Sequence, residues 1–213
     1  MDNKEKIGNV KEEDIKLAAQ AEPKDLKEKP PVNIKDEILE WIESFVFAIF
    51  VVILVFTFFF RIVLVDGDSM NNTLMDKDRL IVTHINYTAQ KGDIVVLNSR
   101  GLDKTIIKRV VGTAGDKVVV DYNDNKVTVN GEEISNEHNR EPMFDTGLFD
   151  RKYQTSENVY EYTVPEDCIF VMGDNRNNSA DGRDQRVGFI KNEDVLGKAV
   201  FRLYPFESIG KVS

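Results

Sequence analysis

Cysteine and histidine are scarce in this sequence. Its 213 residues include one cysteine, Cys168, and two histidines, His84 and His138. A single cysteine excludes an intramolecular disulfide framework and a zinc or iron–sulfur site built from several cysteines. Two histidines leave little material for a histidine-rich metal centre.

Basic residues are also too few to balance the acidic ones. The chain carries 28 Lys and Arg against 37 Asp and Glu, which gives a net charge of −9. Binding of nucleic acid through its phosphates needs a basic surface, so this class of function is disfavoured. Full disorder is excluded, because 41% hydrophobic residues together with 13 glycines are typical of a globular chain.

Apolar side chains are sparse in the first forty positions, which hold 8 Lys and 11 Asp or Glu. So little apolar surface cannot offset the entropy lost when a chain becomes ordered. We therefore expect residues 1–38 to form a disordered tail.

A long hydrophobic run follows this tail. Residues 45–60 contain no charged side chain, and Trp41 and Arg61 lie where interfacial anchors are common. As a helix, residues 42–60 would be about 28 Å long, close to the hydrocarbon thickness of a bilayer. A cleaved signal peptide would begin nearer the N-terminus and end at a small-x-small site, which is absent just beyond the run. We predict an uncleaved transmembrane signal anchor over residues 39–62, with a buried core helix as the alternative.

The distribution of lysines predicts the orientation of this anchor. Lys24, Lys27, Lys29 and Lys35 lie in the twenty residues before residue 42, and fewer basic residues follow the run closely. By the positive-inside rule the tail is cytoplasmic. We therefore expect a single-pass protein of the cell membrane, with residues 63–213 on the extracytoplasmic side.

The part of the chain after the anchor is mainly β in its sequence pattern. Short β-branched runs are separated by Gly, Asn and Asp, and no amphipathic helical pattern exceeds two turns. Asp124-Asn125 reads as a hairpin turn, and the polar residues 135–163 predict an irregular excursion from the sheet core. The predicted strands are LIVTHI (80–85), DIVVLN (93–98), TIIKRVV (105–111), KVVVDY (117–122), KVTVNG (126–131), CIFVMG (168–173) and KAVFRLY (198–204).

A candidate nucleophile lies shortly after the anchor, in VDGDSMNNTL (65–74). A turn here would expose the Ser69 hydroxyl together with a backbone N–H, which a nucleophile and an oxyanion donor require. Taken alone, a serine among Asp, Gly and Asn is most often a turn residue. The G-x-S-x-G motif is missing, so an α/β-hydrolase is excluded.

A serine nucleophile needs a base, and neither histidine lies in a recognisable triad context. Lys108 offers another, because the strand period of two places it on one face with Ile106 and Val110. Apolar surroundings disfavour an ammonium ion and lower its pKa, so that a neutral amine can accept a proton. The alternative is an edge-strand lysine whose amine reaches water.

The third notable stretch is GDNRNNSADGR (173–183), directly after a predicted strand. It matches neither the ligand spacing of an EF-hand nor a phosphate loop ending in G-K-[ST]. We interpret it as a polar scaffold loop, in which Asp181 and Arg183 pair and Ser179 hydrogen-bonds a nearby amine.

Together these stretches resemble the type I signal peptidases, membrane-bound serine–lysine leader peptidases. GDSMNNTL resembles the serine box of that family, GDIVVL (92–97) the following strand box, IIKRVVGTAGD (106–116) the lysine box and GDNRNNSADGR the last box. Their order and spacing after a membrane anchor match the family over roughly residues 40–205.

The resemblance implies a role for each site residue. Ser69 would be the nucleophile with its own backbone N–H as oxyanion donor, Lys108 the general base, and Ser179 the residue that orients the lysine amine. Three residues would maintain the shape of the last loop: Asp174, Asp181 and Arg183. Apolar pockets for small substrate residues would be lined by Val65, Met70, Leu74, Ile106 and Ala180.

The sequence departs from the common family pattern at three positions. Asn72 stands where many members have proline, which should loosen the turn after the nucleophile. Gly182 replaces a serine, with a small expected effect. Gly67 stands where some members carry a hydroxyl as second oxyanion donor, and this glycine resembles the Gram-positive-type branch.

The resemblance implies a mainly β catalytic domain with a hydrophobic surface at the membrane. It also implies removal of signal peptides from exported preproteins at small-x-small sites, beside the secretion translocon and without a metal or organic cofactor. Two alternatives stay open: a self-cleaving serine–lysine protease similar to the SOS repressor autoproteases, and a non-enzymatic membrane-anchored β domain that binds a partner.

Overall fold

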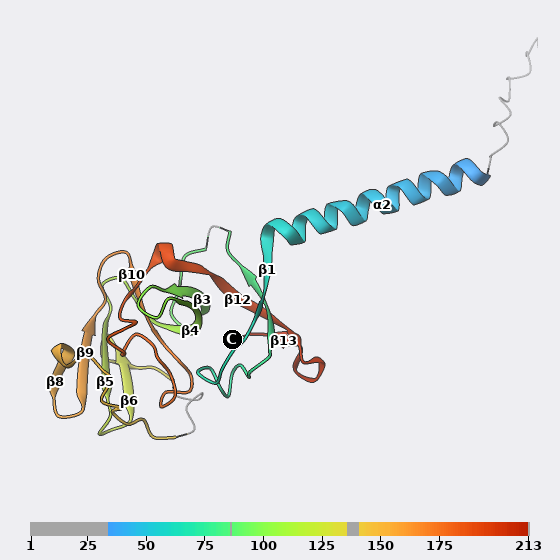
Figure 1. Cartoon of the computed structure of the whole chain (residues 1–213). Helices are drawn as coiled ribbons and strands as arrows, with labels where there is room; N and C mark the ends of the chain where they lie inside the picture. The colour runs from blue at the N-terminus through green and yellow to red at the C-terminus, as the bar shows by residue number, and fades with distance from the viewer. Residues whose placement is uncertain (1–33, 86, 136–140, 213) are drawn as a thin grey trace, which may run out of the picture. The chain divides into compact units, whose positions relative to one another are not determined.

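The structure is a computed structural model that describes residues 34–85, 87–135 and 141–212. Almost all of the predicted tail lies outside these residues, and so does His138. The chain divides into two structural units, residues 1–49 and 50–213. Figure 1 shows one long helix, α2, and a body composed of β-strands.

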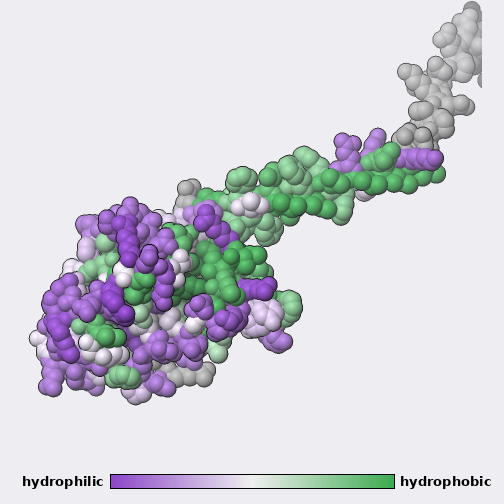
Figure 2. All heavy atoms as spheres, in the orientation of Figure 1, coloured by the Kyte–Doolittle hydropathy of each residue, from purple (hydrophilic) through white to green (hydrophobic). Residues whose placement is uncertain are grey.

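Helix α2 spans Ile34–Phe59, and its segment Glu37–Phe59 is long and apolar enough to cross a membrane. None of that segment is buried inside the protein, and Figure 2 shows an almost continuous apolar surface along it. The length and composition of this segment fit the predicted membrane anchor. The predicted anchor ended at residue 62, but α2 ends at Phe59, because residues from Phe60 onward pair with a neighbouring strand.

The first sheet has eight strands, in the order β1-β2-β12-β3-β4-β10-β11, with β13 beside β12. All neighbouring strands are antiparallel. The long strand β12 pairs with both β2 and β3 and shifts register at irregular positions, so it joins the two halves of the sheet. The strands are β1 (Phe60–Leu64), β2 (Arg79–Thr83), β3 (Ile94–Ser99), β4 (Lys104–Thr113), β10 (Cys168–Met172), β11 (Ile190–Lys191), β12 (Val195–Tyr204) and β13 (Gly210–Lys211).

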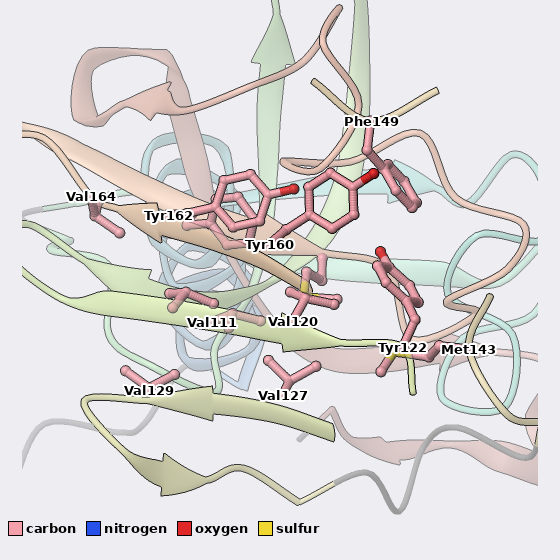
Figure 3. Close-up of a cluster of buried hydrophobic side chains, with 13 residues drawn as sticks. Val111, Val120, Tyr122, Val127, Val129, Met143, Phe149, Tyr160, Tyr162 and Val164 are labelled. Atoms are coloured by element: carbon pink, nitrogen blue, oxygen red, sulfur yellow. The ribbon is translucent and has the colours of Figure 1, made fainter. Parts of the chain in front are cut away.

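A second sheet of five strands has the order β7-β6-β5-β9-β8. Its buried side chains form an aromatic core with Tyr160 and Tyr162, both fully buried (Figure 3). The strands are β5 (Lys117–Asp121), β6 (Lys126–Val129), β7 (Glu132–Glu133), β8 (Gln154–Ser156) and β9 (Val159–Thr163). Three single 3₁₀ turns complete the fold, η1 (Arg151–Tyr153), η2 (Asn192–Asp194) and η3 (Phe206–Ser208).

The mainly β prediction is confirmed, and each of the seven predicted runs overlaps a strand. The predicted turn joins β5 and β6, with Asn125 at a left-handed φ of 55°. The irregular excursion over 135–163 is wrong for its second half, because β8 and β9 belong to the second sheet. Val159-Tyr160-Glu161-Tyr162 has strand alternation, and its tyrosines pack inward while Glu161 is partly exposed.

Large apolar side chains are also exposed outside α2, on neighbouring parts of the first sheet. Strand β1 exposes Ile62 and Leu64, and the connection between β12 and β13 exposes Phe206 and Ile209. These segments are linked through the pairs β1–β2, β2–β12 and β12–β13. An apolar surface therefore extends over the strand that follows directly after the anchor.

Candidate active site

Ser69 lies in the connection between β1 and β2, and backbone hydrogen bonds join the two ends of this connection. Val65 N–H donates to Asp78 O at 2.8 Å, and Lys77 N–H donates back to Val65 O at 3.0 Å. Inside the loop, Gly67 N–H donates to the Asp76 carboxylate at 2.9 Å. Ser69 is thus presented at a fixed turn, partly exposed at the surface.

The turn after Ser69 lacks a proline but is closed by backbone hydrogen bonds. Thr73 and Leu74 N–H both donate to Met70 O, at 3.1 and 2.8 Å. Asn72 adopts a φ of 85°, a left-handed conformation that asparagine tolerates. Proline fixes φ near −65° and cannot take this conformation, so this chain builds a different turn.

Lys108 is placed by the alternation of β4. Ile106, Lys108 and Val110 are all buried, as the strand period predicted, while Ile107 and Arg109 on the other face are partly exposed. Only 3% of Lys108 is exposed, so the alternative of an edge lysine that reaches water is excluded.

The amine of Lys108 contacts the hydroxyl of Ser69. Nζ donates to Ser69 Oγ at 2.6 Å and to the carbonyl of Ile107 at 2.8 Å. Burial disfavours the ammonium form and lowers the pKa of Lys108 to about 8, against an upward pull from the Asp181 carboxylate. At neutral pH about one tenth of the molecules therefore hold a neutral amine beside the serine hydroxyl.

A buried ion pair supports the last loop from within. Arg183 and Asp181 have fully buried side chains, and the guanidinium donates from Nε and Nη2 to both carboxylate oxygens at 2.9 Å. Burial alone would raise the pKa of Asp181, but the charge of Arg183 and its hydrogen bonds lower it. Arg183 also donates to Arg176 O, and Asp181 accepts from Gly173 N–H. The predicted pairing is therefore present and spans the loop.

A second ion pair connects this loop to β4 and to the serine turn. Arg109 donates from Nε and Nη2 to Asp174 at 2.9 and 2.8 Å, and Thr73 Oγ1 donates to the same carboxylate. The loop also holds the backbone around the nucleophile, because Asn175 N–H donates to Ser69 O at 3.1 Å. Asp174 thus fixes the serine turn relative to the lysine strand.

Sequence reasoning missed Arg109 and also Arg202. Arg202 on β12 is largely buried, donates to Thr73 O at 2.6 Å and lies 3.3 Å from the Asp78 carboxylate. Strand alternation placed Arg109 on the face opposite Lys108, which was a usable signal. Nothing local could show that Arg202 reaches a turn 129 residues earlier in the chain.

Ser179 is brought near the nucleophile, but it is not a hydrogen-bond partner of Lys108. Its Oγ is buried and makes no geometrically acceptable hydrogen bond within the residues described. A Cβ on Gly173 would lie 2.2 Å from Ser179 Oγ and 2.5 Å from Ser69 O. Only glycine therefore lets the Ser179 side chain pack this closely to the serine turn.

An open cleft of about 390 Å³ runs along Ser69, between residues 63–70 and residues 104–107. Of the predicted pocket residues, Val65, Met70, Ile106 and Ala180 line this cleft. Leu74 does not, because it is fully buried in the core with Leu80 and Ile94 beneath the serine turn. Its expected pocket role is therefore corrected to a packing role.

The described part of the chain offers no group of three or more His, Cys, Asp or Glu side chains arranged to hold a metal ion. His84 Nδ1 is buried and has no hydrogen-bond partner among the described residues. The basic group in contact with Ser69 is therefore the amine of Lys108 and not the imidazole of His84. This arrangement is suited to nucleophilic catalysis, with the Ser69 hydroxyl next to Lys108, a base of lowered pKa.

Comparison with known proteins gives consistent matches. The family model described as signal peptidase, peptidase S26, matches residues 38–204. Signal peptidase I P from Bacillus subtilis subsp. natto is 35% identical over 178 residues, which cover 82% of this chain and 94% of that protein.

Further relatives have the same description. Signal peptidase I S from Bacillus subtilis (strain 168) is 34% identical and covers 85% of this chain and 97% of its own. Signal peptidase IB from Staphylococcus aureus (strain COL) is 33% identical, with 81% and 93% covered. A crystal structure of a signal peptidase I from Enterococcus faecalis V583 is 28% identical, covers 53% of this chain and 97% of its own, and has a TM-score of 0.40.

Proposed function

The chain belongs to the signal peptidase family, peptidase S26, and is a serine peptidase; we propose that it removes signal peptides from exported preproteins with Ser69 as nucleophile and Lys108 as general base. The observation that carries this proposal is the 2.6 Å contact between Lys108 Nζ and Ser69 Oγ, made by a lysine that is buried. Other lysines that pair with a carboxylate at the surface, such as Lys77 and Lys152, have a raised pKa instead.

In the proposed reaction, the neutral amine of Lys108 takes the hydroxyl proton while Ser69 Oγ bonds to the substrate carbonyl carbon. Lys108 then gives this proton to the leaving amine as the peptide C–N bond breaks. A water, deprotonated by the same lysine, hydrolyses the acyl-enzyme and releases the signal peptide. The hydrogen bond to Ile107 O holds the amine in place during both proton transfers.

The backbone N–H of Ser69 is the proposed donor to the oxyanion. In the described residues it has no acceptor, and the hydrogen bond from Asn175 to Ser69 O fixes the orientation of the turn. One oxyanion donor typically stabilises the transition state by about 3–4 kcal/mol. Gly67 has no side chain to supply a second donor.

Two strand edges favour an extended peptide in the cleft. Strand β1 is the terminal strand of its sheet, and β10 pairs only with residues 109–113 of β4. Backbone groups at the start of β4 and just after β1 therefore face the cleft, where a substrate strand can pair with them. The apolar wall formed by Val65, Met70 and Ile106 suits small residues immediately before the cut.

Membrane attachment would keep this site close to its substrate. Ser69 is only ten residues beyond the end of α2 at Phe59, and the apolar side chains exposed on β1 adjoin that end in the sequence. We place the tail in the cytoplasm, the catalytic domain outside it and the enzyme beside the secretion translocon. Ser179, which lies beside the serine turn, is kept as the second residue that orients Lys108 during the reaction, and no cofactor is required.

The test of the proposed function is cleavage of a purified preprotein by the detergent-solubilised full chain. Mass spectrometry locates the cut, and a parallel preparation of Ser69→Ala controls for contaminating proteases. We expect one cut after a small-x-small sequence, absent with the variant, and lost when the residue before the cut is changed to tryptophan. No Ser69-dependent cut, with a known signal peptidase active in parallel, would instead support the binding-domain alternative.

Cleavage is expected to accelerate as the pH rises through about 8. The base works only as a neutral amine, and below a pKa of about 8 the neutral fraction of Lys108 falls tenfold per pH unit. We expect kcat/KM at pH 6 to be about one hundredth of its value at pH 9. A flat profile over this range, with the chemical step shown to be rate-limiting, would contradict Lys108 as the base.

A further inference from the structure

A second hollow, here called the side pocket, lies beside the cleft. It has a volume of about 180 Å³ and shares only Asn178 and Ala180 with the lining of the cleft. Together with Asn177 and Ser179, these residues of the last loop form one wall of the side pocket. The facing walls are formed by Thr146, Leu148, Phe149, Asp184 and Arg186.

The side pocket opens next to the nucleophile. Ser179 lines it, and both Ser179 Oγ and Ser69 O come within 2.5 Å of the position that a Cβ on Gly173 would occupy. None of the cleft residues from 63–70 or 104–107 lines the side pocket. It is therefore a separate hollow that adjoins the cleft only at Asn178 and Ala180.

Contacts between the last loop and residues 142–149 hold the walls of the side pocket together. Asn177 accepts from Phe144 N–H at 3.1 Å and donates from Nδ2 to Pro142 O at 3.0 Å. Phe149 forms a bridge with Asp184, and the Arg183 guanidinium lies 5.1 Å from the centre of the Phe149 ring. Because these contacts already order the walls, binding of a ligand does not carry the free-energy cost of ordering them.

The direction of the substrate decides which of its residues can reach this pocket. The apolar cleft suits the small residues before the cut, and its wall includes the end of β1, the strand that follows directly after the anchor. A signal peptide that enters from the membrane would occupy this side. The side pocket adjoins the cleft at Asn178 and Ala180, so the chain after the cut can reach it from Ser69.

Resting on the proposed function, we infer that the side pocket binds the first residues of the mature protein after the cut and prefers acidic or amide side chains there. Its rim carries the neutral polar groups of Thr146, Asn177 and Asn178. The half-exposed guanidinium of Arg186 also lies there. It donates hydrogen bonds from Nε and Nη2 to the Asp184 carboxylate at 3.0 and 2.6 Å. Nη1 has no acceptor among the described residues, so it is available to a substrate carboxylate or amide oxygen.

Leu148 allows a test that leaves the buried groups untouched, because its side chain is 52% exposed at the rim. The substrates are one preprotein in three forms, with the first two residues after the cut both Glu, both Gln or both Lys. The measured quantity is the ratio of kcat/KM for the Glu form to that for the Lys form, with the full chain in detergent. A ratio is insensitive to any loss of correctly folded enzyme.

We expect the unaltered enzyme to cleave the Glu and Gln forms faster than the Lys form. Leu148→Lys should raise the Glu-to-Lys ratio and Leu148→Glu should lower it, each by about two- to five-fold, the size of one exposed charge pair. Ser156→Lys and Ser156→Glu place the same charges on the exposed strand β8, outside both hollows, and should leave the ratio unchanged.

Equal ratios for the two Leu148 variants would overturn the inference while the proposed function stands. The same holds if these variants change the preference two residues before the cut rather than after it. If no form is cut in a Ser69-dependent way, the proposed function itself fails and the inference falls with it.

Discussion

Lys108→Met is expected to reduce kcat by about 10²–10⁴-fold, with little change in KM, because the variant removes the base and leaves the cleft intact. Methionine has a similar volume to the lysine stem and carries no charge, so the buried position should accept it without loss of folding. Initial rates of preprotein cleavage measure the effect. Near-UV circular dichroism of the buried tyrosines verifies that the variant is folded.

Lys108→Arg separates a base from a mere positive charge. A guanidinium stays protonated at every working pH and cannot accept the serine proton, so this variant should be as inactive as Lys108→Met. Lys117→Met provides a matched control, because it removes an exposed lysine from β5 that pairs with Glu161. Substantial cleavage by Lys108→Arg would rule out the serine–lysine mechanism.

Asp181→Asn is expected to lower the free energy of unfolding by about 3–5 kcal/mol. The substitution leaves the Arg183 guanidinium fully buried without its charge partner, and it weakens the acceptor for Gly173 N–H. Because Gly173 packs against Ser69 O and Ser179, cleavage should also fall even where the chain stays folded. Urea unfolding of the detergent-solubilised full chain, followed by the tyrosine signal, measures the stability.

An exposed arginine–carboxylate pair serves as the comparison for this buried one. Arg100 pairs with Asp194 and Glu193 at the surface, with 61% of its side chain exposed, so Arg100→Met should change the unfolding midpoint little. If Asp181→Asn unfolds at the same urea concentration as Arg100→Met, the ion pair of the last loop is not a major structural support.

Local patterns in the sequence were sufficient for the fold class and for naming Ser69 and Lys108 as candidates, while the roles proposed for these two residues came from the resemblance to a known family. A β-strand alternates its side chains wherever it lies, so TIIKRVV alone placed Lys108 on a buried face. The same pattern in Val159–Thr163 was available and was missed, because the polar residues around it suggested a loop. The long apolar helix was equally predictable, since sixteen consecutive uncharged residues need no tertiary context.

Contacts between distant segments depend on sheet order and register, which no local pattern contains. Strand pairing and the last loop bring Lys108 within 2.6 Å of a serine 39 positions earlier, and Arg202 within reach of Thr73. The same packing buries Leu74 beneath the turn and places Ser179 beside it without a hydrogen bond to the lysine. The sequence by itself determined which chemical groups are present and which strand faces carry them. Only the tertiary structure decided which groups meet, because each of these contacts closes a long chain loop whose geometry is set by the whole sheet.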